Sequence, residues 1–373
     1  MIFLDNSSTT HKKPRCVISA CKKGLTKLSV NAGRGGYDLS VRAGMEVLNV
    51  RTMFANEFHA NPEDVIFTGS CTQAINLALR GYIKPNGHIV ATVLEHNSVL
   101  RTLEYLKNKY NISYTLVKPV KHIIHPQDIE NAITSKTYLV CCIHTSNVTG
   151  ATNDIEAIGK VCKKHSCKFF VDCAQSGGHI KVDMDKSNIN MLTLAGHKGF
   201  YAPQGIGVLI KRDIDIKPLI YGGTGTHSES LIQPNESPEG LESGTLSIPN
   251  ILALGKGLEF VIKNFDKLNK RIFKLTNTLI NYLKNNNNVI LYSFNPHSGI
   301  ASINIKGKES TEVSDILNEK YNIYVRSGLH CAPKLHEYYN TTSRGMIRFS
   351  ISPYNKMKEI KKCIKAIDHI CKT

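Results

Sequence analysis

Side chains that could support catalysis follow five predicted strands of this sequence. They lie in the segments Gly69-Ser70-Cys71-Thr72-Gln73, Glu95-His96-Asn97, His144-Thr145-Ser146-Asn147, Asp172-Cys173-Ala174-Gln175 and Ala195-Gly196-His197-Lys198-Gly199. A lysine at a strand end can form a Schiff base with an aldehyde, and an acid on a neighbouring strand can pair with a pyridinium nitrogen. A histidine can stack on the ring, and small residues at a helix start offer backbone N–H groups to a phosphate. The combination therefore fits pyridoxal 5'-phosphate (PLP).

Taken one at a time, these residues have ordinary explanations. Lys198 could be a surface lysine, Asp172 could cap a helix, and His96 could be a core or surface histidine. Loops such as Gly69–Thr72 also occur in proteins that bind no phosphate. The interpretation rests on the shared position of these residues at strand ends, in one order, in one predicted sheet.

Short apolar runs alternate with helical patterns between residues 64 and 211. The runs predict strands at Val65–Thr68, His88–Val93, Tyr114–Val117, Tyr138–Ile143, Lys168–Val171, Met191–Leu194 and Gly205–Ile210. Between two of these strands, Asn153–His165 places apolar residues at helical spacing after an Asn-Asp cap. Strands that alternate with helices predict an α/β fold with a mostly parallel sheet covered by helices. Ligands of such sheets bind beyond the carboxyl ends of the strands, where the five segments lie.

The second part of the chain has a different pattern. Residues 222–250 are polar and rich in Gly, Ser and Thr, which predicts a loop, and a helical pattern follows at Ile251–Phe265. The other predicted elements are strands at Gly299–Ile305, Ile323–Arg326 and Met346–Ile351 and helices at Glu312–Lys320 and Lys356–Cys371. We expect a large cofactor-binding domain of residues 16–250 and a small α+β domain of residues 1–15 and 251–373.

Composition excludes several classes of protein. The chain has 373 residues, a net charge of +17 and 41% hydrophobic residues, which excludes a disordered or collagen-like chain. The lysines are scattered, so specific nucleic-acid binding is not predicted. The 11 cysteines include no CxxC pair, and no metal site is predicted. The sequence contains no apolar run of transmembrane length and no secretory signal pattern, so we expect a soluble, cytoplasmic protein that binds no membrane.

On its motifs, the sequence resembles the cysteine desulfurases of the class V aminotransferase family, which are PLP enzymes of fold type I. The matching segments are FLDNSSTT (3–10), FTGSCTQAINLAL (67–79), EHNS (95–98), SNVTG (146–150), VDCAQS (171–176), AGHKGFYAPQGIGVL (195–209), ESGT (242–245), VRSGLHCAP (325–333) and IRFSISPYN (347–355). They cover nearly the whole chain. The succession of VDxAQ, GHK and RSGxHC is the most specific part of the resemblance.

The resemblance implies a role for each matching residue toward PLP. Lys198 forms the Schiff base, Asp172 pairs with the pyridine nitrogen, and His96 stacks on the ring and is counted among the catalytic residues. The other implied cofactor contacts are Gln175 with the phenolic oxygen, Asn147, Cys71, Thr72 and His197, the last three with the phosphate. Thr245 would reach the phosphate from the other subunit, which implies a homodimer.

The implied reaction converts L-cysteine to L-alanine and leaves a persulfide on Cys331 for a sulfur-acceptor protein. Asn147 and Arg348 would bind the substrate carboxylate, Arg348 in a bidentate manner, and Arg326 would lie at the mouth of the site. Attack on sulfur requires a thiolate, and we expect Arg326 and His330 to supply positive charge beside Cys331.

The segment around Cys331 is short and continues into Ala332-Pro333, where the proline stiffens the loop. It resembles the group II desulfurases and selenocysteine lyases, whose nucleophile lies on a confined loop. Low basal turnover and stimulation by an acceptor are therefore expected.

The sequence departs from the family pattern at two places. Ala195 stands where the family has Ser or Thr, which removes one phosphate hydrogen bond, and the phosphate loop reads GSCTQ instead of SGATE. Three other functions compete with desulfuration of L-cysteine. They are lysis of L-selenocysteine, which shares the carboxylate, amine and Cα of cysteine, another class V aminotransferase or lyase reaction, and a non-catalytic binding role. Cys331 favours the desulfurase, and an intact Lys198 and Asp172 argue against loss of catalysis.

Overall fold

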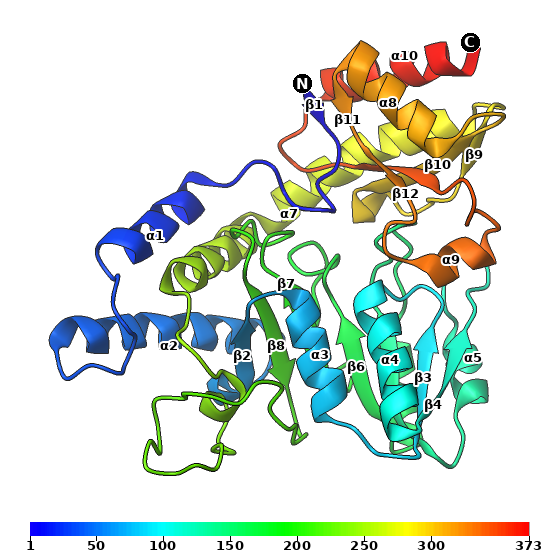
Figure 1. The fold of residues 1–373 in the computed structure, drawn as a ribbon. Helices are drawn as coiled ribbons and strands as arrows, with labels where there is room; N and C mark the ends of the chain where they lie inside the picture. The colour runs from blue at the N-terminus through cyan, green and yellow to red at the C-terminus, as the bar shows by residue number, and fades with distance from the viewer. Residues whose placement is uncertain (373) are drawn as a thin grey trace.

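The computed structural model describes residues 1–372, and its centre is a seven-stranded sheet (Figure 1). The strands are β2 (Val65–Thr68), β3 (His88–Thr92), β4 (Ser113–Val117), β5 (Thr137–Ile143), β6 (Lys168–Asp172), β7 (Met191–Ala195) and β8 (Gly207–Lys211). Their order is β2-β8-β7-β6-β5-β3-β4, and only β8 runs antiparallel to its neighbours. The predicted α/β fold with a mostly parallel sheet is confirmed.

Helices cover both faces of this sheet, which explains why its inner strands are continuous apolar runs. One face packs against α3 (Cys71–Gly81) and α4 (Asn97–Tyr110). The other face packs against α2 (Asp38–Phe58), α5 (Pro126–Ala132), α6 (Ile155–Lys164) and the start of α7. The side chain of Asp154 caps α6 by accepting a hydrogen bond from the Ala157 N–H, as the Asn-Asp cap predicts.

A second, four-stranded antiparallel sheet forms the small domain. Its order is β12 (Arg326–Gly328), β13 (Met346–Ser350), β10 (Ile300–Ile305) and β9 (Val289–Leu291). The helices α8 (Ser310–Tyr321) and α10 (Met357–Lys372) pack against it. The N-terminal strand β1 (Ile2–Phe3) pairs with β11 (Ile323–Tyr324), so β1 and the last helix, α10, both lie at this domain (Figure 1). A short helix, α9 (Pro333–Tyr338), follows the predicted nucleophile.

The helix α7 (Ile248–Lys284) connects the two hydrophobic cores and is longer than the predicted Ile251–Phe265. Its first half, with Ile251 and Leu254, belongs to the core of the large domain. Its second half, with Leu275 and Leu279, belongs to the core of the small domain. The apolar spacing of a helix continues through both halves, and this is why the helix does not end at Phe265. The division into residues 16–250 against 1–15 and 251–373 stays a prediction, and Thr373 lies outside the described residues.

The helix α1 (Arg15–Thr26) lies along α7 (Figure 1) and was not predicted. Its Gly24 lies so close to α7 that an added Cβ would sit 2.5 Å from the Cα of Pro249. Three short 3-10 turns complete the described structure, at Pro62–Asp64, Glu239–Leu241 and Pro296–Ser298. Within residues 1–372, no helix has the length and apolar character needed to cross a membrane.

Candidate active site

A cavity of about 230 Å³ lies where β2, β3, β5, β6 and β7 end. This edge of the sheet faces the small domain (Figure 1). The predicted residues that line it are Cys71, Thr72, His96, Asn147, Asp172, Gln175, His197, Lys198, Arg326 and Arg348. They come from both domains and from sequence positions more than 270 residues apart. The structure therefore brings together side chains that follow the predicted strands and two arginines that the family resemblance implied.

Lys198 and Asp172 are the charged groups at the floor of this cavity. Asp172 is the last residue of β6 and is 1% exposed. Its Oδ1 atom accepts hydrogen bonds from the Ala174 N–H at 2.9 Å and the Cys71 thiol at 3.9 Å. No cation lies within ion-pair distance of Asp172 in the described part of the chain. A carboxylate buried in this way is suited to pair with a cationic ligand group.

Burial sets the protonation of the groups around Asp172. It lowers the pKa of Lys198, although the nearby thiol of Cys71 and the carboxyl of Asp172 act in the opposite direction. It also raises the pKa of the Cys71 thiol well above its ordinary value, and Asp172 adds to that shift. Cys71 is therefore a neutral thiol that donates to the carboxylate.

His96 caps the N-terminus of α4 and lines the cavity. Its Nδ1 atom accepts a hydrogen bond from the Ser98 N–H at 3.0 Å, so the proton of the neutral ring lies on Nε2. Burial lowers the pKa of His96 to about 4, and Lys198 contributes to that shift. The neutral ring has the flat, apolar face that stacking on a cofactor ring requires.

The start of α3 and His197 form the polar wall expected at the phosphate. Ser70 caps α3 by accepting from the Gln73 N–H, so the N–H groups of Cys71 and Thr72 lie in the unbonded first turn of the helix. Burial lowers the pKa of His197 to about 4, and its Nδ1 atom is buried with no partner within residues 1–372. Ala195 lines the cavity without a hydroxyl group.

Arg348 lies on β13 and is 1% exposed. Its Nη1 atom donates to the Asn147 carbonyl at 2.8 Å, and its Nη2 atom donates to Asp5 Oδ1 at 2.8 Å and Ser8 Oγ at 2.9 Å. Its Nε atom is buried and has no partner in the described chain. The Nε–H is thus the donor of this guanidinium left for a ligand carboxylate, while Nη1 and Nη2 are held by the Asn147 carbonyl, Asp5 and Ser8.

The amides of Asn147 and Gln175 are partly engaged within the protein. Asn147 Nδ2 donates to the His330 carbonyl at 2.7 Å and leaves Oδ1 buried without a partner. Gln175 Nε2 donates to the Ser7 carbonyl at 3.1 Å. Sequence reasoning missed Ser7 and Ser8, as it did Asp5, although their segment, FLDNSSTT, was among the motifs.

Cys331 lies beside the cavity, in contact with its rim. Arg326 Nη2 lies 3.6 Å from Cys331 Sγ, and Arg326 lines both the inner cavity and an outer groove of about 560 Å³ that also contains Cys331. The expectation that His330 supplies positive charge is wrong. His330 is 2% exposed, and burial next to Arg348 lowers its pKa well below the ordinary value, so the ring is neutral.

Thr245 does not reach the cavity of its own chain. It lines a separate pocket with Gly205 and Ser243, on the segment just before α7. The adjoining Glu242 forms a buried ion pair with Arg51, which holds this segment against β2.

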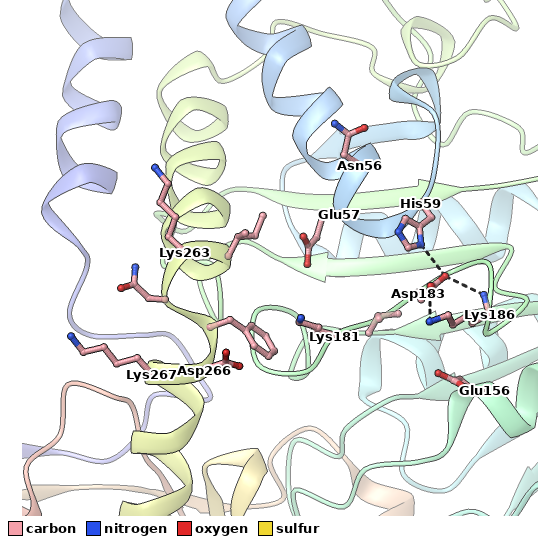
Figure 2. Close-up of a pocket in the computed structure, with 14 residues that line it drawn as sticks. Asn56, Glu57, His59, Glu156, Lys181, Asp183, Lys186, Lys263, Asp266 and Lys267 are labelled. Atoms are coloured by element: carbon pink, nitrogen blue, oxygen red, sulfur yellow. Dashed lines mark hydrogen bonds and ion pairs between the residues drawn. The ribbon is translucent and has the colours of Figure 1, made fainter.

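A larger cavity, about 710 Å³, lies away from the strand ends (Figure 2). It is bounded by the end of α2, the middle of α7 and the segment of residues 181–186. The close-up shows His59 against Asp183, with Lys186 beside them. None of the predicted site residues lines it.

Comparison with known proteins identifies the family. The model of the family "Aminotransferase class-V" matches residues 2–363. The chain belongs to the class V aminotransferase family. Among members of this family, a cysteine desulfurase of Wigglesworthia glossinidia brevipalpis is 31% identical over 98% of this chain and 92% of its own length. The cysteine desulfurase IscS of Rickettsia akari is 29% identical over 98% and 90%.

Solved structures of class V aminotransferases agree with the observed fold. The apo structure of a cysteine desulfurase from Thermococcus onnurineus NA1 superposes with a TM-score of 0.92 and 29% identity. The match covers 100% of this chain and 94% of that one. The predicted family and fold are confirmed.

Proposed function

We propose that this chain is a PLP-dependent cysteine desulfurase that converts L-cysteine to L-alanine and retains the sulfur on Cys331. One observation carries the proposal. A thiol held 3.6 Å from a guanidinium adjoins a cavity that contains a lysine, a buried unpaired carboxylate and an arginine with an unpartnered buried Nε–H. The two relatives named as cysteine desulfurases, which match this chain over 92% and 90% of their own length, support it.

The residues present fit PLP. The unpartnered Nδ1 of His197 and the first-turn N–H groups of α3 suit the phosphate, and Asp172 suits the pyridinium nitrogen. Lys198 is the amine for the Schiff base, and its lowered pKa favours the reactive neutral form. When bound, PLP supplies an electron sink that stabilises negative charge at the substrate Cα.

The chain itself performs the remaining tasks. The unpartnered Nε–H of Arg348 binds the substrate carboxylate and orients Cα. Lys198, once its amine is free, would remove the Cα proton as the general base. The Cys331 thiolate then attacks the substrate sulfur. A new S–S bond forms, the C–S bond breaks, and its electron pair stays with the carbon skeleton, which is protonated and leaves as alanine. Arg326 stabilises the thiolate before attack.

Selenocysteine lyase activity is the less favoured alternative. Cys331 is a sulfur acceptor that release of selenium does not strictly require, and the relatives quoted above are named as cysteine desulfurases. The confined position of Cys331, between α9 and β12, supports the group II type of loop. A persulfide held there would need a dedicated acceptor protein, which we propose as the physiological partner.

The active form is a homodimer in this proposal. The outer face of α2 exposes Val41, Met45 and Leu48, each more than half exposed and spaced three or four residues apart. Ile220, Tyr221, Leu231 and Ile232 expose further apolar surface on the segment before α7. A second copy that covers this surface would explain both its apolar character and the position of Thr245 outside its own cavity.

The experiment that tests the activity measures alanine released by the purified, PLP-loaded protein. L-cysteine and L-selenocysteine are supplied in parallel under the same reductant. Alanine and a protein persulfide from L-cysteine are expected. Alanine from L-selenocysteine alone would establish the lyase instead, and amino transfer to a 2-oxo acid without alanine from cysteine would establish an aminotransferase.

A further inference from the structure

The turn that carries Cys331 has an unusual backbone. His330 and Cys331 are consecutive residues with positive φ angles of 49° and 57°. Residues with a Cβ rarely adopt this left-handed region, and two in succession persist only where the surroundings hold them. The turn is closed locally by the Ala332 N–H, which donates to the Leu329 carbonyl at 2.9 Å. That bond alone does not orient the turn toward the cavity.

Two bonds from the large domain hold the carbonyl groups of this turn. Asn147 Nδ2 donates to the His330 carbonyl, and the Asn97 N–H donates to the Cys331 carbonyl, both at 2.7 Å. Asn147 follows β5 and Asn97 follows β3, so both donors lie at the strand ends that form the site. The nucleophile lies in the small domain but takes its position from the sheet edge.

The orientation of the Asn147 amide follows from its neighbours. Rotating the amide by half a turn would place Oδ1 against the His330 carbonyl oxygen, two acceptors without a proton between them. Asn147 is 4% exposed, so water cannot relieve that contact. Its backbone carbonyl in turn accepts from Arg348 Nη1 at 2.8 Å. Asn147 is therefore bonded both to the residue before the nucleophile and to the arginine proposed to bind the substrate carboxylate.

We propose that Asn147 is the positioning residue for Cys331: its side-chain amide holds the left-handed His330–Cys331 turn so that the thiol stays beside Arg326 and the cavity. This inference rests on the proposed function, and it adds a task to the carboxylate contact that the family resemblance implies. Through its side chain and its backbone carbonyl, Asn147 joins the turn that carries the sulfur acceptor to the arginine of the substrate site.

Hydrogen exchange of the substrate-free, PLP-loaded protein tests this proposal. In Asn147→Ala the turn loses its side-chain hydrogen bond to the large domain. The amide exchange rate is therefore expected to rise roughly tenfold at Ala332, whose N–H is bonded within the turn, and at Asn97, whose N–H is bonded to the turn. Asn147→Asp keeps the size but replaces the donor with a carboxylate oxygen, and the same rise is expected. PLP absorbance and the melting temperature check that each variant is folded.

Asn295→Ala is the matched control. Asn295 Nδ2 also bonds across the domains, to Thr152 Oγ1 at 3.0 Å and the Gly150 carbonyl at 3.3 Å, but it does not touch the Cys331 turn. Its loss should leave exchange at Ala332 and Asn97 unchanged. An equal rise in this control would overturn the proposal, because it would mean that any loosening between the domains frees the turn.

The kinetic readout separates positioning from substrate binding. At saturating L-cysteine, the Asn147→Ala protein should show the spectral change of PLP on substrate addition but form the persulfide about tenfold more slowly. Unchanged exchange together with a raised KM and a normal rate at saturation would instead make Asn147 a carboxylate-binding residue only. If the wild-type protein forms no persulfide at all, the proposed function fails. The exchange measurement still shows whether the Asn147 side chain holds the His330–Cys331 turn.

Discussion

The Nη2 atom of Arg326 lies 3.6 Å from the Sγ atom of Cys331, and Arg326 Nη1 lies 3.4 Å from Ser8 Oγ. Ser8 also accepts from Arg348, so one hydroxyl group links the arginine beside the nucleophile to the arginine of the carboxylate site. Since His330 is neutral, Arg326 is the cation in contact with the thiol among the residues described. The nucleophile and the substrate site are thus parts of one bonded network.

Replacing the nucleophile should separate cofactor binding from sulfur transfer. Cys331→Ser keeps the size of the side chain but removes the sulfur, so the protein should bind PLP normally and form no persulfide. Alanine release from L-cysteine should fall by about a hundredfold or more, as expected for loss of a covalent nucleophile. Cys16→Ser, at an exposed thiol on α1, is the control and should behave as wild type. A persulfide retained in Cys331→Ser would remove Cys331 from this role.

Glu95 should make stability depend on pH. Its side chain is fully buried. Oε1 accepts hydrogen bonds from Thr92 Oγ1 and from the Ile143 N–H, while Oε2 has no partner within residues 1–372. Burial raises the pKa of the carboxyl to about 8. Between the unfolded pKa near 4.5 and that value, the folded protein binds a proton that the unfolded chain has lost. The contribution of Glu95 to the free energy of unfolding is therefore fully present below pH 4.5 and is lost as the pH rises toward 8.

Glu95→Gln removes that dependence because the amide has no proton to lose. Relative to wild type, the free energy of unfolding of the variant should rise by at most about 1.4 kcal/mol per pH unit across this window and then level off. Melting temperatures of both proteins at pH 5, 6.5 and 8.5 provide the measurement. Glu312→Gln, on the exposed face of α8, is the control. A gap between variant and wild type that does not change with pH would show that Glu95 is ionised in the fold.

Replacing only one partner of the buried Arg51–Glu242 ion pair should strongly destabilise the protein. Arg51 is 6% exposed, lies over the ring of Phe67 at 4.7 Å and bonds to the Glu242 carboxylate, which also accepts from the Phe67 N–H. Arg51→Met leaves an uncompensated buried carboxylate, which should lower the free energy of unfolding by about 3–5 kcal/mol. The double variant Arg51→Met/Glu242→Leu should recover much of that loss.

Denaturant unfolding of the three proteins tests this. A double variant less stable than Arg51→Met would contradict the interpretation, because it would mean that the carboxylate stabilises the fold without the arginine. The affinity for PLP should also fall in Arg51→Met, since Glu242 anchors the segment that carries Thr245.

A charge on the outer face of α2 should dissociate the proposed homodimer. Met45→Glu places a carboxylate in the centre of the apolar stripe, so sedimentation should show the mass of one chain instead of two. The affinity for PLP should fall about tenfold, as expected for loss of a phosphate hydrogen bond from Thr245 of a second copy. Ile290→Glu, at an exposed isoleucine of β9, is the control. A wild-type protein that sediments as one chain would contradict the homodimer directly.

Much of the fold and site could be predicted because strand ends in a parallel sheet meet at one edge. The apolar run before Asp172 placed that carboxylate within one residue of the observed end of β6. What could not be predicted depends on packing between segments far apart in the sequence. From the sequence, His330 is expected to be a charged neighbour of Cys331. In the structure, burial beside Arg348 makes the ring neutral. The tether of Asn147 to the His330 carbonyl joins residues 183 positions apart, and neither motif alone indicates it.

The helix α7 has a consequence for how the chain can be divided. Its 37 residues make a rod of about 55 Å, of which one half completes the core of the large domain and the other half completes the core of the small domain. A cut anywhere along it leaves each fragment with a frayed end and an uncovered apolar face. The two domains therefore cannot be expressed as independent pieces, and heat or denaturant should melt them in a single cooperative step.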